Sequence, residues 1–455
     1  MLKAVVKAFS IPDLRRRIVF TLIVLAIFRV IAHVPIIGIS ADIKNKLASF
    51  ISGNTSSGGS NPNPVGGVLG FLDIFSGGSL SNFSIVLTGV YPYITATIIM
   101  QLLQPIIPRL EALAKEGERG RSTINRYTHI ITVPITFLTA YGQIVLLKNQ
   151  GIITGTEAQK FSLFGAGSDP LLTLSALFSI TAGTLLLVWM GELITEFGIG
   201  QGVSMIILGG IVSGIPGKLR QAGNSSLGQN IVSIVIIALV LLLAVVGIVL
   251  IQEGQRKIPV RFPNRTQGAK VYGGQSTFIP LRVNSAGMIP LIFASSIIIF
   301  PATVAAFFVR RDKPDDIVSN IANWFVFNLG INSGLYQLLY FAMVVGFTYF
   351  YTLVIFNQQD ITGNLRDRGG FIPGRRPGRP TNDYLMGELN RLTFIGAIFL
   401  GGVAILPFLL GLIVQTQVST FLNSTSLLIV VGVAVDTMKQ LEAQLTMREY
   451  QGILK

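Results

Sequence analysis

The sequence predicts an all-α, polytopic membrane protein, and three observations support this fold class. Half of the 455 residues are hydrophobic, only 12% are charged, and the mean hydropathy is +0.64. A soluble protein carries about twice that share of charged residues. Apolar runs of about 20 residues, the length that crosses a bilayer as a helix, recur along the whole chain. The excess of basic residues, finally, collects in only some of the connections between these runs.

Ten apolar runs are the predicted membrane spans. Two of them, Gly202–Ile215 and Ser424–Met438, are short, and length alone would make them interfacial or re-entrant segments. The other eight are long enough to cross, and they are Ile18–Ile37, Phe83–Ile107, Ile124–Leu147, Leu171–Met190, Ile231–Ile251, Ala286–Val309, Leu335–Phe356 and Leu392–Val414.

Charge decides how the two short runs are interpreted. The basic connections are the N-terminus, residues 109–126, 253–282 and 366–391, and the tail from Lys439. Basic connections of a membrane protein lie on the cytoplasmic side. All of them share one side only if both short runs cross, which predicts ten spans and places both termini in the cytoplasm.

The order of the spans predicts two halves. The short spans are the fifth and the tenth, so each closes a set of five, in residues 1–219 and 220–455. Five spans that begin inside, followed by five that begin outside, are typical of an inverted-topology repeat. This interpretation depends on span order and length, since the two halves share no convincing sequence identity.

The stretch from Val65 to Pro105 indicates a pore between the halves. It begins with an apolar stub too short to cross, continues with a break at Gly77–Gly78, and ends in a span that Pro92 interrupts. Non-helical backbone at membrane depth is tolerated only where protein buries it or where it lines a wet cavity. The apolar residues of the stub are Val68, Leu69, Phe71, Leu72, Ile74 and Phe75.

Few residues within the spans could carry chemistry. Arg29 is expected to snorkel or to bind backbone carbonyls, and Asp436 to cap or pair near the cytoplasmic end of its span. His33 and His129 have no ligand-spaced partners, so neither a metal nor another cofactor is expected. The glycine-rich segment 198–202 follows a span rather than a strand, which predicts a tight hairpin and not a dinucleotide-binding loop.

Two cytoplasmic connections have a pattern of their own. Residues 253–282 alternate apolar and polar side chains around Pro259 and Pro263, which predicts a projecting β-like hairpin. Residues 366–391 are basic, and their prolines and glycines are expected to exclude helix. Such loops serve either as topology determinants that contact lipid headgroups, or as a docking surface for a large acidic or RNA-containing partner.

Six sequence motifs resemble those of the SecY family, the channel subunits of the bacterial Sec protein translocase. They occur in the family's order and together span essentially the whole chain. The motifs are FSGGSLSNFSIVLTGVYPYITATIIMQLL, EGERGRSTINRYT, GELITEFGIGQGVSMII, YGGQSTFIPLRVNSAGMIPLIFASSIIIFP, FIPGRRPGRP and TSLLIVVGVAVDTMKQLEAQL.

The resemblance implies a role for several groups of residues. The stub at about residues 65–75 would be a plug that seals the closed channel from outside. A lateral gate between the second and seventh spans would include Gln101, Ser295 and Ser296. The implied pore ring consists of Val90, Ile94, Val203, Ile207, Ile292 and Ile429. The implied docking residues in loops 253–282 and 360–391 are Arg261, Arg265, Arg375, Arg376 and Arg379.

The resemblance also implies a function and its partners. The chain would pass unfolded polypeptides across the bacterial inner membrane, release hydrophobic segments sideways into lipid, and catalyse no reaction. SecE-like and SecG-like membrane subunits, the SecA motor ATPase, the ribosome, and signal peptides or nascent chains would be its partners. A small-solute secondary transporter would also have inverted repeats and broken helices, but paired midplane carboxylates are not evident. An intramembrane enzyme would need a catalytic constellation within the spans, and none is evident.

Overall fold

The structure is a computed structural model. It describes residues 9, 11–36, 46–47, 69–70, 72–73, 76–150, 152–153, 169–224, 231–262, 265–267, 270–272, 276–287, 289–308, 317–329, 333–359, 361–367, 369–414 and 424–453.

Helices dominate the described residues, and one lies at the position of each predicted span. The longer helices are α2 (Pro12–Ile31), α5 (Tyr91–Leu103), α7 (Glu118–Asn149), α9 (Pro170–Phe197), α10 (Gly202–Asn224), α12 (Ile231–Glu253), α13 (Ile289–Phe308), α15 (Gly334–Gln359), α17 (Arg379–Val414) and α19 (Ser424–Ile453). Three shorter helices, α6 (Pro108–Lys115), α14 (Ile317–Asn328) and α16 (Ile361–Asp367), lie in the connections.

Four of the described helical segments are long and apolar enough to cross a membrane. They are Glu118–Lys148, Pro170–Phe197, Gly334–Asp367 and Arg379–Leu406. Shorter apolar helices include Tyr91–Leu103 and Gly202–Pro216. A polytopic, mostly helical membrane fold is therefore confirmed, while the number of spans stays a prediction.

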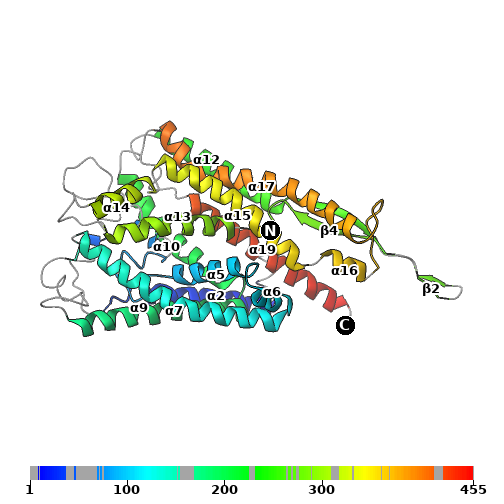
Figure 1. Cartoon of the computed structure of the whole chain (residues 1–455), viewed down its shortest axis with the longest axis horizontal. Helices are drawn as coiled ribbons and strands as arrows, with labels where there is room; N and C mark the ends of the chain where they lie inside the picture. The colour runs from blue at the N-terminus through cyan, green and yellow to red at the C-terminus, as the bar shows by residue number, and fades with distance from the viewer. Residues whose placement is uncertain are drawn as a thin grey trace.

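The helices form one elongated bundle (Figure 1). Helices α2, α5, α7 and α9 lie along one side of the view, and α12, α13, α15 and α17 lie along the other. Helix α10 packs on α9 and belongs to the first group, and α19 packs on α12 and α17 and belongs to the second. Two seams join the groups. One is formed where α10 packs against α19, and the other where α5 and α7 contact α13.

A β-hairpin projects from one end of the bundle (Figure 1). Strand β1 (Gln255–Arg261) pairs antiparallel with β4 (Ser276–Arg282), with Pro259 opposite Phe278. Farther out, β2 (Arg265–Gln267) pairs with β3 (Lys270–Tyr272). The predicted hairpin is confirmed, and alternation of side chains between its two faces is the pattern that revealed it.

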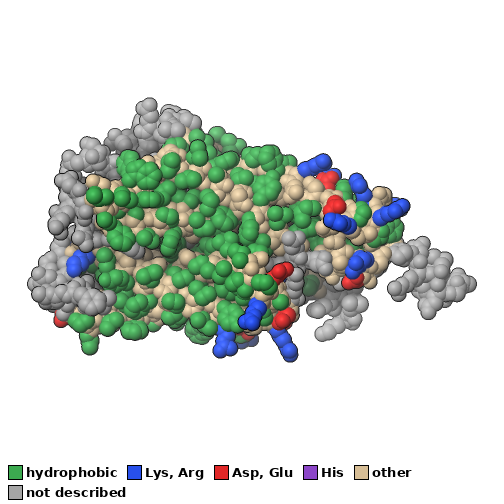
Figure 2. All heavy atoms as spheres, in the orientation of Figure 1, with side chains coloured by type: hydrophobic (Ala, Val, Ile, Leu, Met, Phe, Trp, Pro, Cys, Tyr) green, Lys and Arg blue, Asp and Glu red, His purple; other side chains and the backbone are tan. Residues whose placement is uncertain are grey.

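Charge is concentrated at the hairpin end, whereas the rest of the visible face is largely apolar (Figure 2). The same end holds the start of α2 and the distal part of α19 (Figure 1). There Leu14 of α2 packs with Leu441 and Leu445 of α19. An apolar lateral surface with basic residues at one end is the pattern of a membrane protein whose cytoplasmic side is basic.

Two predictions about proline were wrong. Pro92 does not interrupt a span that begins at Phe83, because residues 76–90 form turns and helix α5 begins only at Tyr91. Prolines and glycines likewise do not exclude helix throughout 366–391, because α17 begins at Arg379 with Pro380 in its first turn. In both helices proline occupies the first turn, where its missing N–H would have no partner in any case.

The three short helices in the connections, α6, α14 and α16, were not predicted from the sequence. The connection 310–334 contains α14, a helix of 12 residues that packs mainly on α13. With 12 residues, α14 is shorter than the roughly 20 apolar residues that cross a bilayer, so hydropathy did not identify it as a span.

Candidate functional site: a polar cavity beside the main hydrophobic cluster

A polar cavity of about 490 Å³ lies between α10, α13, α15 and α19, near the base of the hairpin. Gln201, Ser204 and Asn284 contribute polar groups to its lining. Ile292 and Val433 also line it and belong to the main hydrophobic cluster of the bundle. The cavity therefore lies between a charged end of the molecule and the main hydrophobic cluster.

Charges of both signs line this cavity. The carboxylate of Asp436 interacts electrostatically with Lys439 and Arg282. Lys439 Nζ also donates a hydrogen bond to the carbonyl oxygen of Gln252 at 2.8 Å. The expected pairing of Asp436 is present only as this electrostatic interaction, and Asp436 caps no helix end, because α19 continues to Ile453. Because charges of both signs line the cavity, it attracts water but selects neither cations nor anions.

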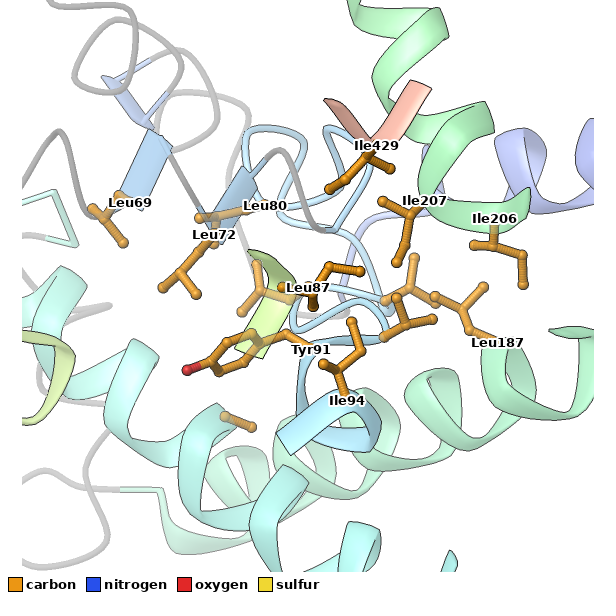
Figure 3. Close-up of a cluster of buried hydrophobic side chains, with 14 of the residues drawn as sticks. Leu69, Leu72, Leu80, Leu87, Tyr91, Ile94, Leu187, Ile206, Ile207 and Ile429 are labelled. Carbon is orange, nitrogen blue, oxygen red and sulfur yellow. The ribbon is translucent and has the colours of Figure 1, made fainter. Parts of the chain in front are cut away.

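The six residues of the predicted ring lie in the main hydrophobic cluster. Val90 directly precedes α5, and the others lie on α5, α10, α13 and α19. All except the partly buried Val203 are buried. Figure 3 shows Ile207 and Ile429 close to one another, with Ile94 on the α5 side of the cluster.

The predicted plug stub contributes to the same cluster. Leu69 and Leu72 are buried, and they lie near Leu80 in Figure 3. Leu69, Gly70, Leu72 and Asp73 are helical, as the sequence predicted. The other predicted plug residues, Val68, Phe71, Ile74 and Phe75, lie outside the described residues.

The non-helical segment 76–90 lies between this stub and α5, and its own side chains and the residues after α2 satisfy several of its backbone groups. Ser79 Oγ lies 2.6 Å from the carbonyl oxygen of Ser76 and 2.8 Å from that of Val86, so its single hydroxyl hydrogen is shared between the two acceptors. Ile85 N donates to the carbonyl oxygen of Val34, which follows α2. The expectation that broken backbone at this place is buried in protein is thus confirmed.

Glycine permits the close approach of this segment to α9. A methyl group at Gly183 would lie 2.2 Å from the carbonyl oxygen of Ile85, which is too close for any side chain. The neighbouring hydroxyls of Thr88 and Thr184 are hydrogen-bonded at 2.5 Å. These contacts help to position Val90, which lies two residues after Thr88.

The predicted gate residues occupy the facing helices α5 and α13. Ser295 Oγ donates to the carbonyl oxygen of Ile292 within its own helix at 2.9 Å. Ser296 Oγ and Gln101 Oε1 are buried and have no hydrogen-bond partner. Gln101 also lines a second cavity, of about 260 Å³, between α5, α7 and α15.

The predicted docking arginines lie at the hairpin end. The backbone of Arg261 exchanges two hydrogen bonds, each of 2.9 Å, with Phe371 in the other loop. The Arg375 guanidinium lies 5.0 Å from the ring centre of Tyr384, and Arg376 and Arg379 are exposed. The side chain of Arg265 lies outside the described parts of the chain.

An ion pair between an exposed arginine and a buried glutamate, which the sequence did not reveal, also joins the two loops. Arg256 Nη1 lies 2.9 Å from Glu388 Oε2, and the Glu388 side chain is only 9% exposed. Around the pair, Ile258 and Val260 of β1 pack with Leu385 and Leu389 of α17. The two basic loops therefore form one platform.

Comparison with known proteins gives a consistent result. The sequence model of the SecY family matches residues 84–438. A protein translocase subunit SecY from Thermus thermophilus is 41% identical over 461 residues, covering 100% of this chain and 98% of that protein. The corresponding subunit from Halalkalibacterium halodurans is 39% identical over 465 residues, covering 100% of both chains.

Solved structures share the fold. A chain described as the structure of a protein conducting channel aligns with a TM-score of 0.59 at 18% identity, covering 94% of this chain and 92% of that one. Sec61 in the canine ribosome–channel complex from the endoplasmic reticulum aligns with a TM-score of 0.58 at 17% identity, with the same coverage.

Proposed function

The chain belongs to the SecY family, and we propose that it is the protein-conducting subunit of a translocase. In this proposal it passes unfolded polypeptides across the membrane and releases hydrophobic segments sideways into lipid. The chain itself catalyses no reaction, so a partner supplies the energy. Curated relatives with full-length coverage carry the name of a protein translocase subunit, which supports this function.

The observation that carries the proposal is the polar cavity whose lining includes Ile292 of the main hydrophobic cluster. A wet vestibule would hydrate an entering polypeptide, whereas branched aliphatic side chains at its end would exclude ions by dewetting. Aliphatic side chains also offer a passing backbone no hydrogen bonds that would retain it. We therefore assign the ring role to Val90, Ile94, Val203, Ile207, Ile292 and Ile429.

The remaining parts follow from this assignment. The stub at about residues 65–75 acts as the plug, and Gln101, Ser295 and Ser296 belong to the lateral gate between α5 and α13. A segment leaving by this gate enters lipid, where about 20 apolar residues are favoured and a central charge costs about 3 kcal/mol. When the lateral gate opens, residues 1–219 move as one body away from residues 220–455.

The platform made by loops 253–282 and 360–391 is the proposed docking surface. Its exposed arginines suit an acidic or RNA-containing partner, and solved relatives of this fold are described in complex with ribosomes. We assign the ribosome and a SecA-type motor to this platform, and SecE-like and SecG-like subunits to the apolar sides. The protein is placed in the bacterial inner membrane, with both termini in the cytoplasm.

Crosslinking to a stalled polypeptide tests the proposal directly, because the chain contains no cysteine. Ile94→Cys and Ile292→Cys are each expected to form a disulfide with a cysteine placed in the membrane-spanning part of a stalled substrate. A small-solute transporter would give no such product. Gel mobility of the labelled substrate, with and without reductant, is the measurement.

Leu242→Cys is the matched control, because this residue of α12 is 64% exposed on the outer surface of the bundle. It should not crosslink to the stalled chain. Absence of crosslinks from both ring positions, with a substrate verified as stalled, would remove the ring assignment.

A further inference from the structure

Arg29 is the one charged residue that the sequence places clearly inside an early span, and it has a specific partner. Its Nη1 donates a hydrogen bond to the carbonyl oxygen of Gly77 at 2.7 Å. Gly77 opens the turn that follows the plug stub. A half-buried guanidinium in an apolar helix is costly unless it is paired. The contact therefore ties α2 to the end of the stub.

The stub folds around the same guanidinium. Asp73, its last described helical residue, interacts electrostatically with Arg29. Asp73 Oδ1 accepts a hydrogen bond from Ser81 N at 2.8 Å, and the Asp73 carbonyl accepts one from Gly78 N at 2.8 Å. The turn is thus closed on itself and held on α2 by one cation.

A second contact holds this turn against α10. Gly77 has a φ of +69°, and a methyl group there would lie 2.8 Å from the ring of Phe28 and 3.0 Å from Cα of Gly210 on α10. A methyl group at Gly210 would lie 2.5 Å from Gly77 Cα. Two glycines are needed for this approach, because any side chain at Gly210 would push the turn away.

We propose that Arg29 and Gly210 form a plug latch, meaning the two contacts that hold the Gly77 turn and thereby keep the plug seated. The inference rests on the proposed function, but it concerns residues on α2 and α10 that lie outside the predicted plug and ring. Opening requires the Arg29–Gly77 hydrogen bond to break and the turn to leave Gly210. Arg29 is accordingly a positioning residue, which acts through the stub.

Ion leakage through the purified translocase in proteoliposomes tests the latch, with halide influx followed by a quenched dye. Arg29→Met removes the donor but keeps an apolar side chain of similar length. Since a hydrogen bond to a charged group is lost, the leak should rise about tenfold or more. Gly210→Ala should raise the leak independently, because it displaces the turn without touching the cation. Arg29→Lys should lie between wild type and Arg29→Met, since it keeps the charge but not the planar fork.

Gly214→Ala is the matched control on the same helix, because a methyl group there would meet nothing within 4 Å. Its leak should stay within about twofold of the wild-type value, as for other surface substitutions. If wild type translocates but Gly210→Ala and Arg29→Met leak no more than Gly214→Ala, the latch is wrong while the function stands. If Arg29→Met does not insert into the membrane, the ion leak of Gly210→Ala alone tests the latch. If wild type passes no polypeptide, the proposed function fails first.

Discussion

The two seams that join the halves of the bundle are built differently. We call the contact of α10 and the α9–α10 turn with α19 the back seam, and the contact of α5 and α7 with α13 the gate seam. At the back seam, Gly200 N donates to Gln440 Oε1 at 3.1 Å. Ile199 N in the same turn donates to Thr21 Oγ1 of α2 at 3.1 Å. At the back seam, therefore, one hydrogen bond from a backbone N–H crosses to α19 and another fixes the turn to α2.

The gate seam has the opposite character. Gln101 Oε1 and Ser296 Oγ are buried without partners, and within the described residues no hydrogen bond joins α5 to α13. A buried polar group left unpaired costs about 1–3 kcal/mol. Separation of this seam would let water or a passing backbone satisfy both groups.

The difference identifies which seam can open. Separation of the back seam would break existing hydrogen bonds and expose the apolar contact of Leu14 and Ile199 with Leu441 and Leu445. Separation of the gate seam removes a penalty. The molecule is consequently expected to hinge at the back seam and part at the gate seam.

The largest effect is expected from a substitution that breaks the back seam at its turn. A methyl group at Gly202 would lie 1.6 Å from the carbonyl oxygen of Gly191, and Gly202 N donates to Thr195 Oγ1 at 2.9 Å. Gly202→Ala must therefore displace α10 from α9, and should cost about 3 kcal/mol or more of folding free energy. Thermal unfolding in detergent measures the loss. Gly214→Ala should unfold like wild type, and an unchanged midpoint for Gly202→Ala would contradict this account of the turn.

An intermediate effect is expected at the gate seam. Ser296→Ala and Gln101→Leu remove buried groups that have no partner, so each should stabilise the closed seam by about 1 kcal/mol. Membrane insertion of a marginally hydrophobic segment should therefore fall several-fold, since each 1.4 kcal/mol changes an equilibrium tenfold. The fraction of segment inserted by proteoliposomes is the measurement.

The adjacent serine supplies the control for the gate seam. Ser295 Oγ is already bonded to the carbonyl oxygen of Ile292 in its own helix, so Ser295→Ala should leave insertion nearly unchanged. Equal effects of the two serine substitutions would show that the unpaired hydroxyl is not what matters.

Local patterns in the sequence predicted the local parts of this structure. Alternation around Pro259 predicted the hairpin, and the glycines of 198–202 predicted the turn between α9 and α10, where Gly200 has a φ of +87°. The same local logic failed at Pro92 and Pro380. A proline that interrupts a helix and one that begins a helix have the same sequence signature unless the upstream turns are recognised.

Contacts between distant segments could not be predicted from one sequence. Arg29 was expected to bind backbone carbonyls, which is confirmed, but nothing local identifies Gly77 as the acceptor. The Arg256–Glu388 pair joins two loops separated by three helices. The polar cavity exists only because four helices converge, each contributing a few residues that look unremarkable alone. Partner choice in such cases is set by helix packing, which periodicity does not encode.

The smallest effect is expected from a single hydrogen bond of the back seam, and it separates the two seams most sharply. Gln440→Ala leaves the buried N–H of Gly200 without its acceptor, which should cost about 1 kcal/mol and lower the unfolding midpoint by about 2 °C at most. Gln440→Glu keeps an oxygen acceptor and should restore most of the loss. Insertion of the marginal segment should be the same for both variants, because the gate seam is untouched. If Gln440→Ala instead raised insertion, the back seam would itself have to part, and a single hinge on that side would be excluded.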